Sequence, residues 1–436
     1  MTTETAAGSE ILGRGARDGA RLFREWYLDL SKAPDRGEKT AYVFVMGSLA
    51  EFLRSFGFNV SFPEINALQT AVRKVEMDFL NPAEEYGYSP DICAYVRVGV
   101  GIQLRNEDHP MGRVPKPDLG IATNACNTYI KWAEIWERFY HAPVFTLDVP
   151  GRRAIDRLPD PGDSDFESDR RYVEAQLREL IPLCEKITGT KFDIDRLRET
   201  LGETNRMNAA WRRVLELNAS TPAVYNAVGE GTIYLGVVNA LRGDVKGTRY
   251  FEELAEELSY KAANGIGGIE QEKHRLIFVG VPCYPIFRRF NEMFTGHGGV
   301  FVGSTYLWFA SGGFQAQYMY DLKNPIESLA EGLLLQVGRG MSDMFFVHTP
   351  ILEMVKRLHA DGVVFHPIKS CRTVSSGLAD GRRLINELSG ISSLYIESDL
   401  VDRRVVSEAQ MKNRVDAFFE ALDARKLRGE AAHKAA

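Results

Sequence analysis

The pattern of apolar and polar positions along the chain predicts an α/β protein. In the N-terminal part, short apolar runs alternate with longer stretches that are apolar on one helical face only. Runs without polar alternation are typical of strands that helices cover on both faces, and strands that alternate with helices form parallel, doubly wound sheets. We expect strands at residues 41–45, 59–62, 119–123 and 144–148.

The same pattern returns in the C-terminal part, which predicts a second sheet. We expect its strands at residues 275–280, 299–303, 362–366 and 393–396. A closing helix is predicted at 408–422, and the tail after Arg425 is expected to fray. Helical patterns fill most of the region between the two sheets.

These elements predict two doubly wound parallel-sheet domains of the flavodoxin-like type, joined by a helical region. An amphipathic helix at residues 9–31 precedes the first domain, and a turn-rich, charged run at 150–165 follows it. The predicted organisation is a helical segment at 1–38, a first α/β domain at 39–150, a helical region at 165–268 and a second α/β domain at 270–425.

Length and charge narrow the class of protein. The 436 residues exceed the roughly 250–300 at which one hydrophobic core stops growing, so more than one domain is expected. With 53 basic and 59 acidic residues, the net charge of -6 argues against a nucleic-acid surface. No apolar run approaches the roughly 18 residues of a membrane span, and the N-terminus has no signal-peptide pattern. We therefore expect a cytoplasmic protein.

The sequence contains no nucleotide-binding motif in its usual context. The glycines at 265–268 precede a predicted strand, whereas a dinucleotide fingerprint follows one, and there is no Gly-x-x-x-x-Gly-Lys-Ser/Thr loop. We expect neither an ATP nor an NAD site.

Three of the five cysteines stand where chain elements are expected to begin or end. Cys126 and Cys371 each follow a predicted strand and precede a helix, and such loops gather at the carboxyl edge of a parallel sheet. Ser89 is predicted to cap a helix whose first turn contains Cys93, where a helix terminus favours a thiolate. In a reducing compartment, cysteines are thiols or metal ligands more often than disulfides.

The alternative for any buried cysteine is ordinary packing, since cysteine behaves as a small apolar residue. Cys184 lies within a predicted helix and is expected to be structural. Cys283, just beyond a predicted strand, is either a further ligand or a residue that lines or packs beside the site.

Several phrases in the sequence resemble the 2-hydroxyacyl-CoA dehydratase and benzoyl-CoA reductase family, in its catalytic subunits. They are ICAYVR, PDLGIATNACNTYIKW, the tripeptide SCR, IESDLVDRR and QMKNRVDAFFEAL, and they run in order over nearly the whole chain. The phrases APVFTLDVPG and FVGVPCYP are most similar to the benzoyl-CoA reductase branch, in its B subunit.

This resemblance implies an iron–sulfur enzyme. It implies a 4Fe-4S cluster held by Cys93, Cys126 and Cys371, which leaves one iron without a protein sulfur. In the family, single electrons pass to a CoA thioester. Benzoyl-CoA reductases reduce the aromatic ring to cyclohexadiene-carbonyl-CoA, whereas the dehydratases expel a hydroxyl group through a ketyl radical.

The resemblance also implies partners. A smaller homologous catalytic subunit, ATPase activator subunits with a bridging iron–sulfur cluster, and ferredoxin would complete the enzyme. The function expected first is a benzoyl-CoA reductase subunit, and the second is a 2-hydroxyacyl-CoA dehydratase subunit. A third alternative is a scaffold whose cysteines hold a metal without catalysis.

Other polar residues are weaker candidates for the substrate site. Ser48 and Glu64 follow the first two predicted strands, but an ordinary helix N-cap and an ordinary first-turn acid explain them equally well. His366 and Arg372 flank Cys371 and are expected either to reach the ligand or to support it. The glycine pair at 312–313 and the turn at 339–340 could admit a ligand close to the backbone.

Overall fold

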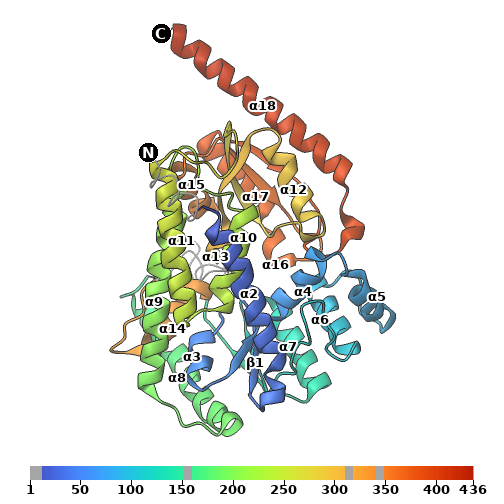
Figure 1. The fold of residues 1–436 in the computed structure, drawn as a ribbon, viewed down its shortest axis with the longest axis vertical. Coiled ribbons are helices and arrows are strands. Elements are labelled where there is room, and N and C mark those ends of the chain that lie inside the picture. Colours follow the sequence, from blue (N-terminus) through green and yellow to red (C-terminus); the bar gives the residue numbers. More distant parts are fainter. Residues whose placement is uncertain (1–11, 152–159, 310–317, 339–347, 436) are drawn as a thin grey trace, which may run out of the picture. The chain divides into compact units, whose positions relative to one another are not determined.

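The computed structural model describes residues 12–151, 160–309, 318–338 and 348–435 (Figure 1). The chain forms two compact units, and each is discontinuous in sequence. The first consists of residues 1–214, 233–257 and 308–343, and the second of residues 215–232, 258–307 and 344–436. The domain boundaries given above stay a prediction.

The first unit contains a four-stranded, fully parallel sheet. Its strands are β1 (Thr40–Val43), β2 (Asn59–Ser61), β3 (Leu119–Thr123) and β4 (Val144–Leu147), in the order β2-β1-β3-β4. All residues of β1 and β3 are buried, as the apolar runs predicted. After β2 the chain passes to the other side of β1, where β3 pairs with it. This reversal creates a switch point at the carboxyl ends of the two central strands, β1 and β3.

Helices surround this sheet along the chain. They are α3 (Ala50–Ser55), α4 (Pro63–Val72), α5 (Met77–Glu85), α6 (Ala94–Leu104) and α7 (Asn127–Tyr140). Pro63 begins α4 because its ring fixes φ at a helical value and its missing N–H is not needed there. The long helix α6 packs against α4, α5 and α7.

The N-terminal helix α2 (Arg14–Lys32) confirms the predicted amphipathic helix over the residues that the structure describes. It is fixed to α11 (Val245–Ala263), because the Glu257 carboxylate accepts the backbone N–H groups of Gly13 and Gly15, each at 2.6 Å. The remaining long helices are α8 (Ser164–Thr188), α9 (Ile194–Leu217), α10 (Gly229–Ala240) and α14 (Pro325–Leu333).

The second unit contains another four-stranded parallel sheet with the same connectivity. Its strands are β5 (His274–Gly280), β6 (Gly299–Ser304), β7 (Gly362–His366) and β8 (Ser392–Tyr395), in the order β6-β5-β7-β8. Its helices include α12 (Phe287–Thr295), α15 (His348–Arg357), α16 (Arg372–Ser375) and α17 (Leu378–Ser389). Two doubly wound, flavodoxin-like sheets with helical segments between them confirm the predicted fold class.

Two predicted element ends are wrong. The closing helix α18 (Glu408–Ala435) continues well past Arg425, because the Lys, Glu and Ala residues of the tail are good helix formers (Figure 1). Helix α6, which precedes β3 in the sequence, begins at Ala94, whereas the sequence predicted a start at Pro90. Within the described residues, no helix combines the length and the apolar character that crossing a membrane requires.

Candidate functional site

Cys126 lies at the carboxyl edge of the first sheet, where β3 gives way to α7. It is the N-cap of α7, with an extended backbone (φ -145°, ψ 134°), and it is half-buried. Asn124 fixes this loop to the exit of β4: its Nδ2 donates to the Asp148 carboxylate at 2.6 Å, and its Oδ1 accepts from the Val149 N–H at 2.9 Å. The amide therefore holds the turn from which Cys126 begins its helix.

Cys93 is the N-cap of α6 and does not lie in its first turn. Ser89 makes a local turn instead of capping a helix: its Oγ accepts from the Asp91 N–H at 3.2 Å, and its carbonyl accepts from the Ile92 N–H at 3.2 Å. Such hydroxyl-to-backbone bonds compete with helix formation. The correction moves Cys93 to the helix terminus itself, where a helix dipole favours an anion.

Glu64 is a buried acid in the first turn of α4, held on both oxygens. Its Oε2 accepts from the Val45 N–H at 2.5 Å, just past β1, and its Oε1 accepts from the Tyr129 hydroxyl on α7. Tyr129 in turn stacks on Phe44, with ring centroids 3.8 Å apart. Burial raises the pKa of Glu64 to about 7, although the bonds from Tyr129 and Val45 oppose the shift. This carboxyl can therefore take up or release a proton near neutral pH.

Ser48 is half-buried in the loop after β1. The interpretation of Ser48 as a helix cap is wrong, because Leu49 is the N-cap of α3. The preceding Gly47 has φ 74°, and a Cβ there would lie 2.9 Å from a Thr123 methyl group at the end of β3. The loop can thus pass close to β3 only with glycine at this position.

Cys371 lies at the carboxyl edge of the second sheet, between β7 and the short helix α16, of which it is the N-cap. It is half-buried, like Cys93 and Cys126. The N–H of the preceding Ser370 donates to the buried Asp399 carboxylate at 3.1 Å, and the Lys369 N–H donates to the Ser398 carbonyl at 2.9 Å. Both acceptors follow β8, so the exit of one strand holds the cysteine loop of its neighbour.

The remaining two thiols are fully buried. Burial raises the pKa of Cys184 to about 12 and the pKa of Cys283 to about 11. Both pKa shifts disfavour the thiolate form in which a cysteine binds a metal. The packing interpretation suits these two residues better than the ligand interpretation.

The residues that flank Cys371 differ from each other. His366 is fully buried, and both ring nitrogens are engaged: Nδ1 lies 2.6 Å from the Val281 carbonyl and Nε2 lies 2.5 Å from the Ser398 hydroxyl. Burial lowers its pKa to about 4. Arg372 is exposed, and its guanidinium donates to the Lys369 carbonyl at 3.3 Å. The glycines at 312–313 and the turn at 339–340 lie outside the described residues.

Three residues near these groups are not among the site candidates that the sequence indicates. Tyr129, Ser398 and Asp399 each form hydrogen bonds to a candidate residue or its loop. Tyr129 stands three positions after Cys126, on the same helical face, and this spacing is the one local signal that could have pointed to it. Ser398 and Asp399 are far from Cys371 in sequence, and only the pairing of β7 with β8 brings them near its loop.

The half-buried thiols fit a soft-metal site by their chemistry. Thiolates are the ligands of iron–sulfur clusters, and both α6 and α7 present a helix N-terminus that favours the anionic form. Cys93 and Cys126 belong to the first unit, and Cys371 belongs to the second. Across the described ranges, no three His, Cys, Asp or Glu side chains form a group that could hold a metal ion.

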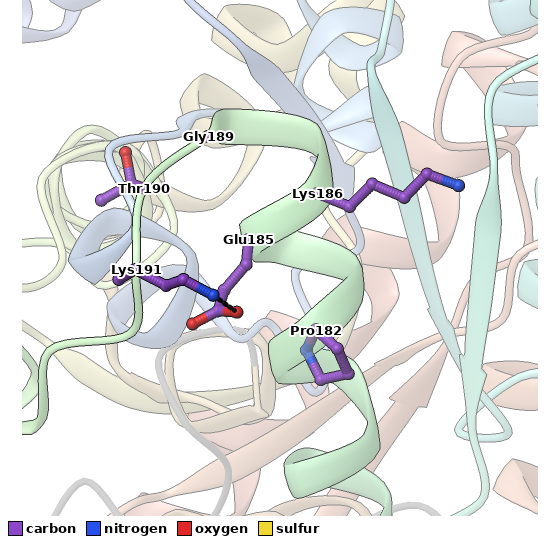
Figure 2. Close-up of a pocket in the computed structure, with 6 residues that line it drawn as sticks. All are labelled: Pro182, Glu185, Lys186, Gly189, Thr190 and Lys191. Atoms are coloured by element: carbon purple, nitrogen blue, oxygen red, sulfur yellow. Dashed lines mark hydrogen bonds and ion pairs between the residues drawn. The ribbon is translucent and has the colours of Figure 1, made fainter.

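A surface pocket of about 270 Å³ lies at the C-terminal end of α8 (Figure 2). The Lys191 ammonium pairs with the Glu185 carboxylate at 2.9 Å inside it, and the Lys186 side chain points away from this pair. The pocket is lined by Pro182, Glu185, Lys186, Gly189, Thr190 and Lys191. None of the candidate residues above belongs to this lining.

Comparison with known proteins identifies the class. Residues 48–422 match the family described as 2-hydroxyglutaryl-CoA dehydratase, D-component. The chain therefore belongs to this family of acyl-CoA dehydratases and reductases, as its sequence phrases predicted.

Individual relatives are similar over almost their whole length. The chain is 32% identical to the B subunit of benzoyl-CoA reductase from Thauera aromatica over 412 residues, which cover 92% of each chain. It is 27% identical to the (R)-2-hydroxyisocaproyl-CoA dehydratase alpha subunit of Clostridioides difficile, over 94% of this chain and 97% of that one. It is also 27% identical to the alpha subunit of lactoyl-CoA dehydratase from Anaerotignum propionicum, over 92% and 95%.

Proposed function

We propose that this chain is the iron–sulfur catalytic subunit of a benzoyl-CoA reductase. The observation that carries the proposal is the 32% identity to the B subunit of a benzoyl-CoA reductase over 92% of both chains, compared with 27% for the two dehydratase subunits. The substrate would be an aromatic CoA thioester, and the product a cyclohexadiene-carbonyl-CoA.

The cofactor would be a 4Fe-4S cluster held by Cys93, Cys126 and Cys371. These are the half-buried thiols, whereas the two thiols with raised pKa values are fully buried. When bound, such a cluster supplies single electrons at low potential, and its three-thiolate ligation leaves one iron open. Cys283 would then pack beside the site as a protonated thiol.

We propose that Glu64 donates or accepts a proton at the carboxyl edge of the first sheet. Its pKa of about 7 matches the range in which a general acid or base works best. The Tyr129 hydroxyl and the Val45 N–H fix both carboxyl oxygens, so the group is oriented before a substrate arrives. Ser48, half-buried after β1, would offer its hydroxyl to the thioester.

The chain would work within a larger assembly. Its relatives are named as subunits, which supports a homologous partner subunit. Electrons of low potential require a donor, so we propose ATPase subunits with a bridging cluster and ferredoxin as the source. The cytoplasmic location stays a prediction.

The second candidate is a subunit of a 2-hydroxyacyl-CoA dehydratase, because the matching family is described by such an enzyme and the dehydratase alpha subunits cover as much of the chain. The same thiols and the same Glu64 would serve that reaction. A metal-binding scaffold without catalysis is the third candidate.

Turnover separates these candidates. The chain is purified anaerobically with its homologous partner and its ATP-dependent activator. With ATP and with reduced ferredoxin as the electron donor, benzoyl-CoA is compared with a 2-hydroxyacyl-CoA. We expect ATP-dependent reduction of benzoyl-CoA and no dehydration. Dehydration alone would establish the second candidate, and an iron-containing complex without either activity would establish the third. The isolated chain should hydrolyse no ATP.

A further inference from the structure

A directed chain of hydrogen bonds joins three strand exits at the carboxyl edge of the second sheet. The Val281 carbonyl can only accept, so the nitrogen of His366 that lies 2.6 Å away, Nδ1, carries the proton. With a pKa lowered to about 4 by burial, the ring is neutral, so Nε2 must accept from the Ser398 hydroxyl at 2.5 Å. The exits of β5, β7 and β8 are thereby fixed to one another.

The backbone of the same serine holds the loop that carries Cys371. The Ser398 carbonyl accepts from the Lys369 N–H at 2.9 Å, and the Ser398 N–H donates to the Pro367 carbonyl at 3.3 Å. This pairing extends the contact between β7 and β8 past the ends of both strands. Pro367 and Lys369 of the loop are consequently held beside Ser398, just past the end of β8.

Asp399 adds a charged contact one residue further on. Its side chain is buried, at 1% exposure, and Oδ2 accepts from the Ser370 N–H at 3.1 Å. Oδ1 accepts from the N–H groups of Val401 and Asp402, each at 3.0 Å. A buried carboxylate is costly unless it is fully hydrogen-bonded, and bonds to a charged acceptor are stronger than neutral ones. The amide of the residue before Cys371 is thus bound by a buried carboxylate that is itself held by two further N–H groups.

We propose that Asp399 and Ser398 are positioning residues for the Cys371 thiol. Asp399 fixes the N–H of the residue before Cys371. Ser398 fixes the Lys369 N–H and the Pro367 carbonyl and connects them, through His366, to the core of the sheet. Cys371 therefore starts α16 from one defined position even though a helix of four residues cannot hold it alone. The ligand of Cys371 rests on the proposed function. The clamp, by which we mean the hydrogen bonds of Asp399 and Ser398 to the Cys371 loop, is a feature of the chain itself.

The test uses the full chain without metal. The rate of alkylation by iodoacetamide is measured at Cys371 and, in the same molecules, at Cys126 by peptide mass spectrometry. In Asp399→Asn and Asp399→Ala, labelling of Cys371 should become roughly fivefold faster, the factor expected for one lost hydrogen bond, while labelling of Cys126 stays unchanged. Hydrogen exchange at the Ser370 amide should accelerate together with it.

Asp361→Asn is the matched control, because Asp361 also accepts a backbone N–H, that of Arg275 at 2.7 Å, but at the start of β5. It should leave both labelling rates unchanged. If Asp399→Ala does not fold, Ser398→Ala and Asp399→Asn carry the test, since Ser398→Ala keeps the backbone bonds and should affect Cys371 less than Asp399→Asn. An unchanged ratio of Cys371 to Cys126 labelling in folded Asp399→Asn would overturn the proposal.

Iron separates this proposal from the proposed function. After anaerobic reconstitution, Asp399→Asn should load less iron than Asp361→Asn at equal thermal stability, and Asp399→Glu should not restore loading, because its longer side chain displaces the carboxylate. If Cys371 labelling responds as expected but the wild-type chain binds no iron, the clamp stands and the cofactor assignment fails. If iron loading is normal in Asp399→Asn and the labelling is unchanged, the clamp fails and the assignment stands.

Discussion

The two sheets share one strand order, but their carboxyl edges carry different chemistry. In the first, the switch point between β1 and β3 is flanked by Ser48 and Cys126, and the nearby Glu64 has a pKa of about 7. In the second, the switch point between β5 and β7 is occupied by the buried Cys283 and by His366, a neutral ring with both nitrogens bonded. The first edge therefore carries an acid whose pKa is near neutral, and the second carries a ring that is held on both nitrogens.

The loops that carry Cys126 and Cys371 also differ between the two sheets. In both sheets this loop follows the third strand and is fixed to the exit of the fourth. The first sheet uses a neutral amide within the loop, Asn124, and the second uses a buried carboxylate outside it, Asp399. One fold can thus hold a thiol in place by two unrelated sets of contacts, so its topology matters more than any one residue type.

The largest effect is expected from the cysteines. Replacing Cys93, Cys126 or Cys371 by Ala should each abolish iron binding, since a cluster with two protein thiolates is poorly held. Cys283→Ala should retain iron, because that thiol is buried and protonated. Iron and sulfide analysis after anaerobic reconstitution measures both, and loss of iron in Cys283→Ala would make Cys283 a further ligand.

Glu64→Gln should lower turnover roughly 100-fold, the typical contribution of a general acid or base, while the visible spectrum of the cluster stays intact. Asp118→Asn is the control, because Asp118 accepts the Thr40 N–H at 2.9 Å at the opposite edge of the same sheet. An unchanged rate in Glu64→Gln would remove this residue from the site. A lost spectrum would assign it to the support of the fold instead.

Gly280, the last residue of β5, and Gly47, in the loop after β1, should differ in their tolerance of a larger side chain. At Gly280, with φ 124°, a Cβ would lie 2.4 Å from the His366 carbonyl oxygen, whereas at Gly47 it would meet side-chain atoms at 2.9 Å or more. Backbone cannot move aside as a methyl group can, so Gly280→Ala should cost roughly 3 kcal/mol or more and Gly47→Ala about 1–2 kcal/mol.

Urea unfolding measures this difference. Gly202→Ala in α9 is the control, because a Cβ there would meet only Leu322 Cδ1 at 3.8 Å, an ordinary contact. Ala is also the better helix former, so a gain of about 0.5–1 kcal/mol is expected. Equal losses at Gly47 and Gly280 would show that the two edges are equally packed.

The smallest effect concerns pH. The folded pKa of His366, about 4, lies below its usual 6.5, so only the unfolded chain takes up this proton as the pH falls, and stability is lost between pH 6.5 and 4. The pKa of Glu64 is raised to about 7, so the folded chain takes up that proton first and gains stability between pH 7 and 4.5.

Unfolding free energies at pH 7 and pH 5 test these opposite signs. His366→Gln should reduce the loss on acidification by roughly 1–2 kcal/mol, and Glu64→Gln should increase it by a similar amount. Changes of the same sign in both variants would contradict the contrast between the two edges.

The sequence predicted the sheets well because their central strands, β1, β3, β5 and β7, are buried on both faces. The strands β3 and β7 begin and end where the apolar runs do, and each is followed by its cysteine at a helix N-cap. The errors fall where local hydrogen bonds compete. Ser89 has the residue type of a helix cap, but it satisfies its own turn, and this moves the start of α6 to Cys93.

The supporting residues of the site could not be predicted, because they depend on tertiary pairing. No residue near Glu64 in the sequence indicates that the Tyr129 hydroxyl binds it, because the two residues meet only through the packing of α7 beside β1. Likewise, Asp399 serves the Cys371 loop because β8 pairs with β7. The pKa of Glu64 and the neutrality of His366 follow from burial, which no local motif encodes.

The most direct test of the account is the metal content of the wild-type chain. Anaerobic reconstitution with iron and sulfide, followed by iron and sulfide analysis and visible absorption, should give about four irons and four sulfides per chain with a broad iron–sulfur band. A chain that stays folded and colourless, with no bound iron under these conditions, would contradict the assignment of Cys93, Cys126 and Cys371 as cluster ligands.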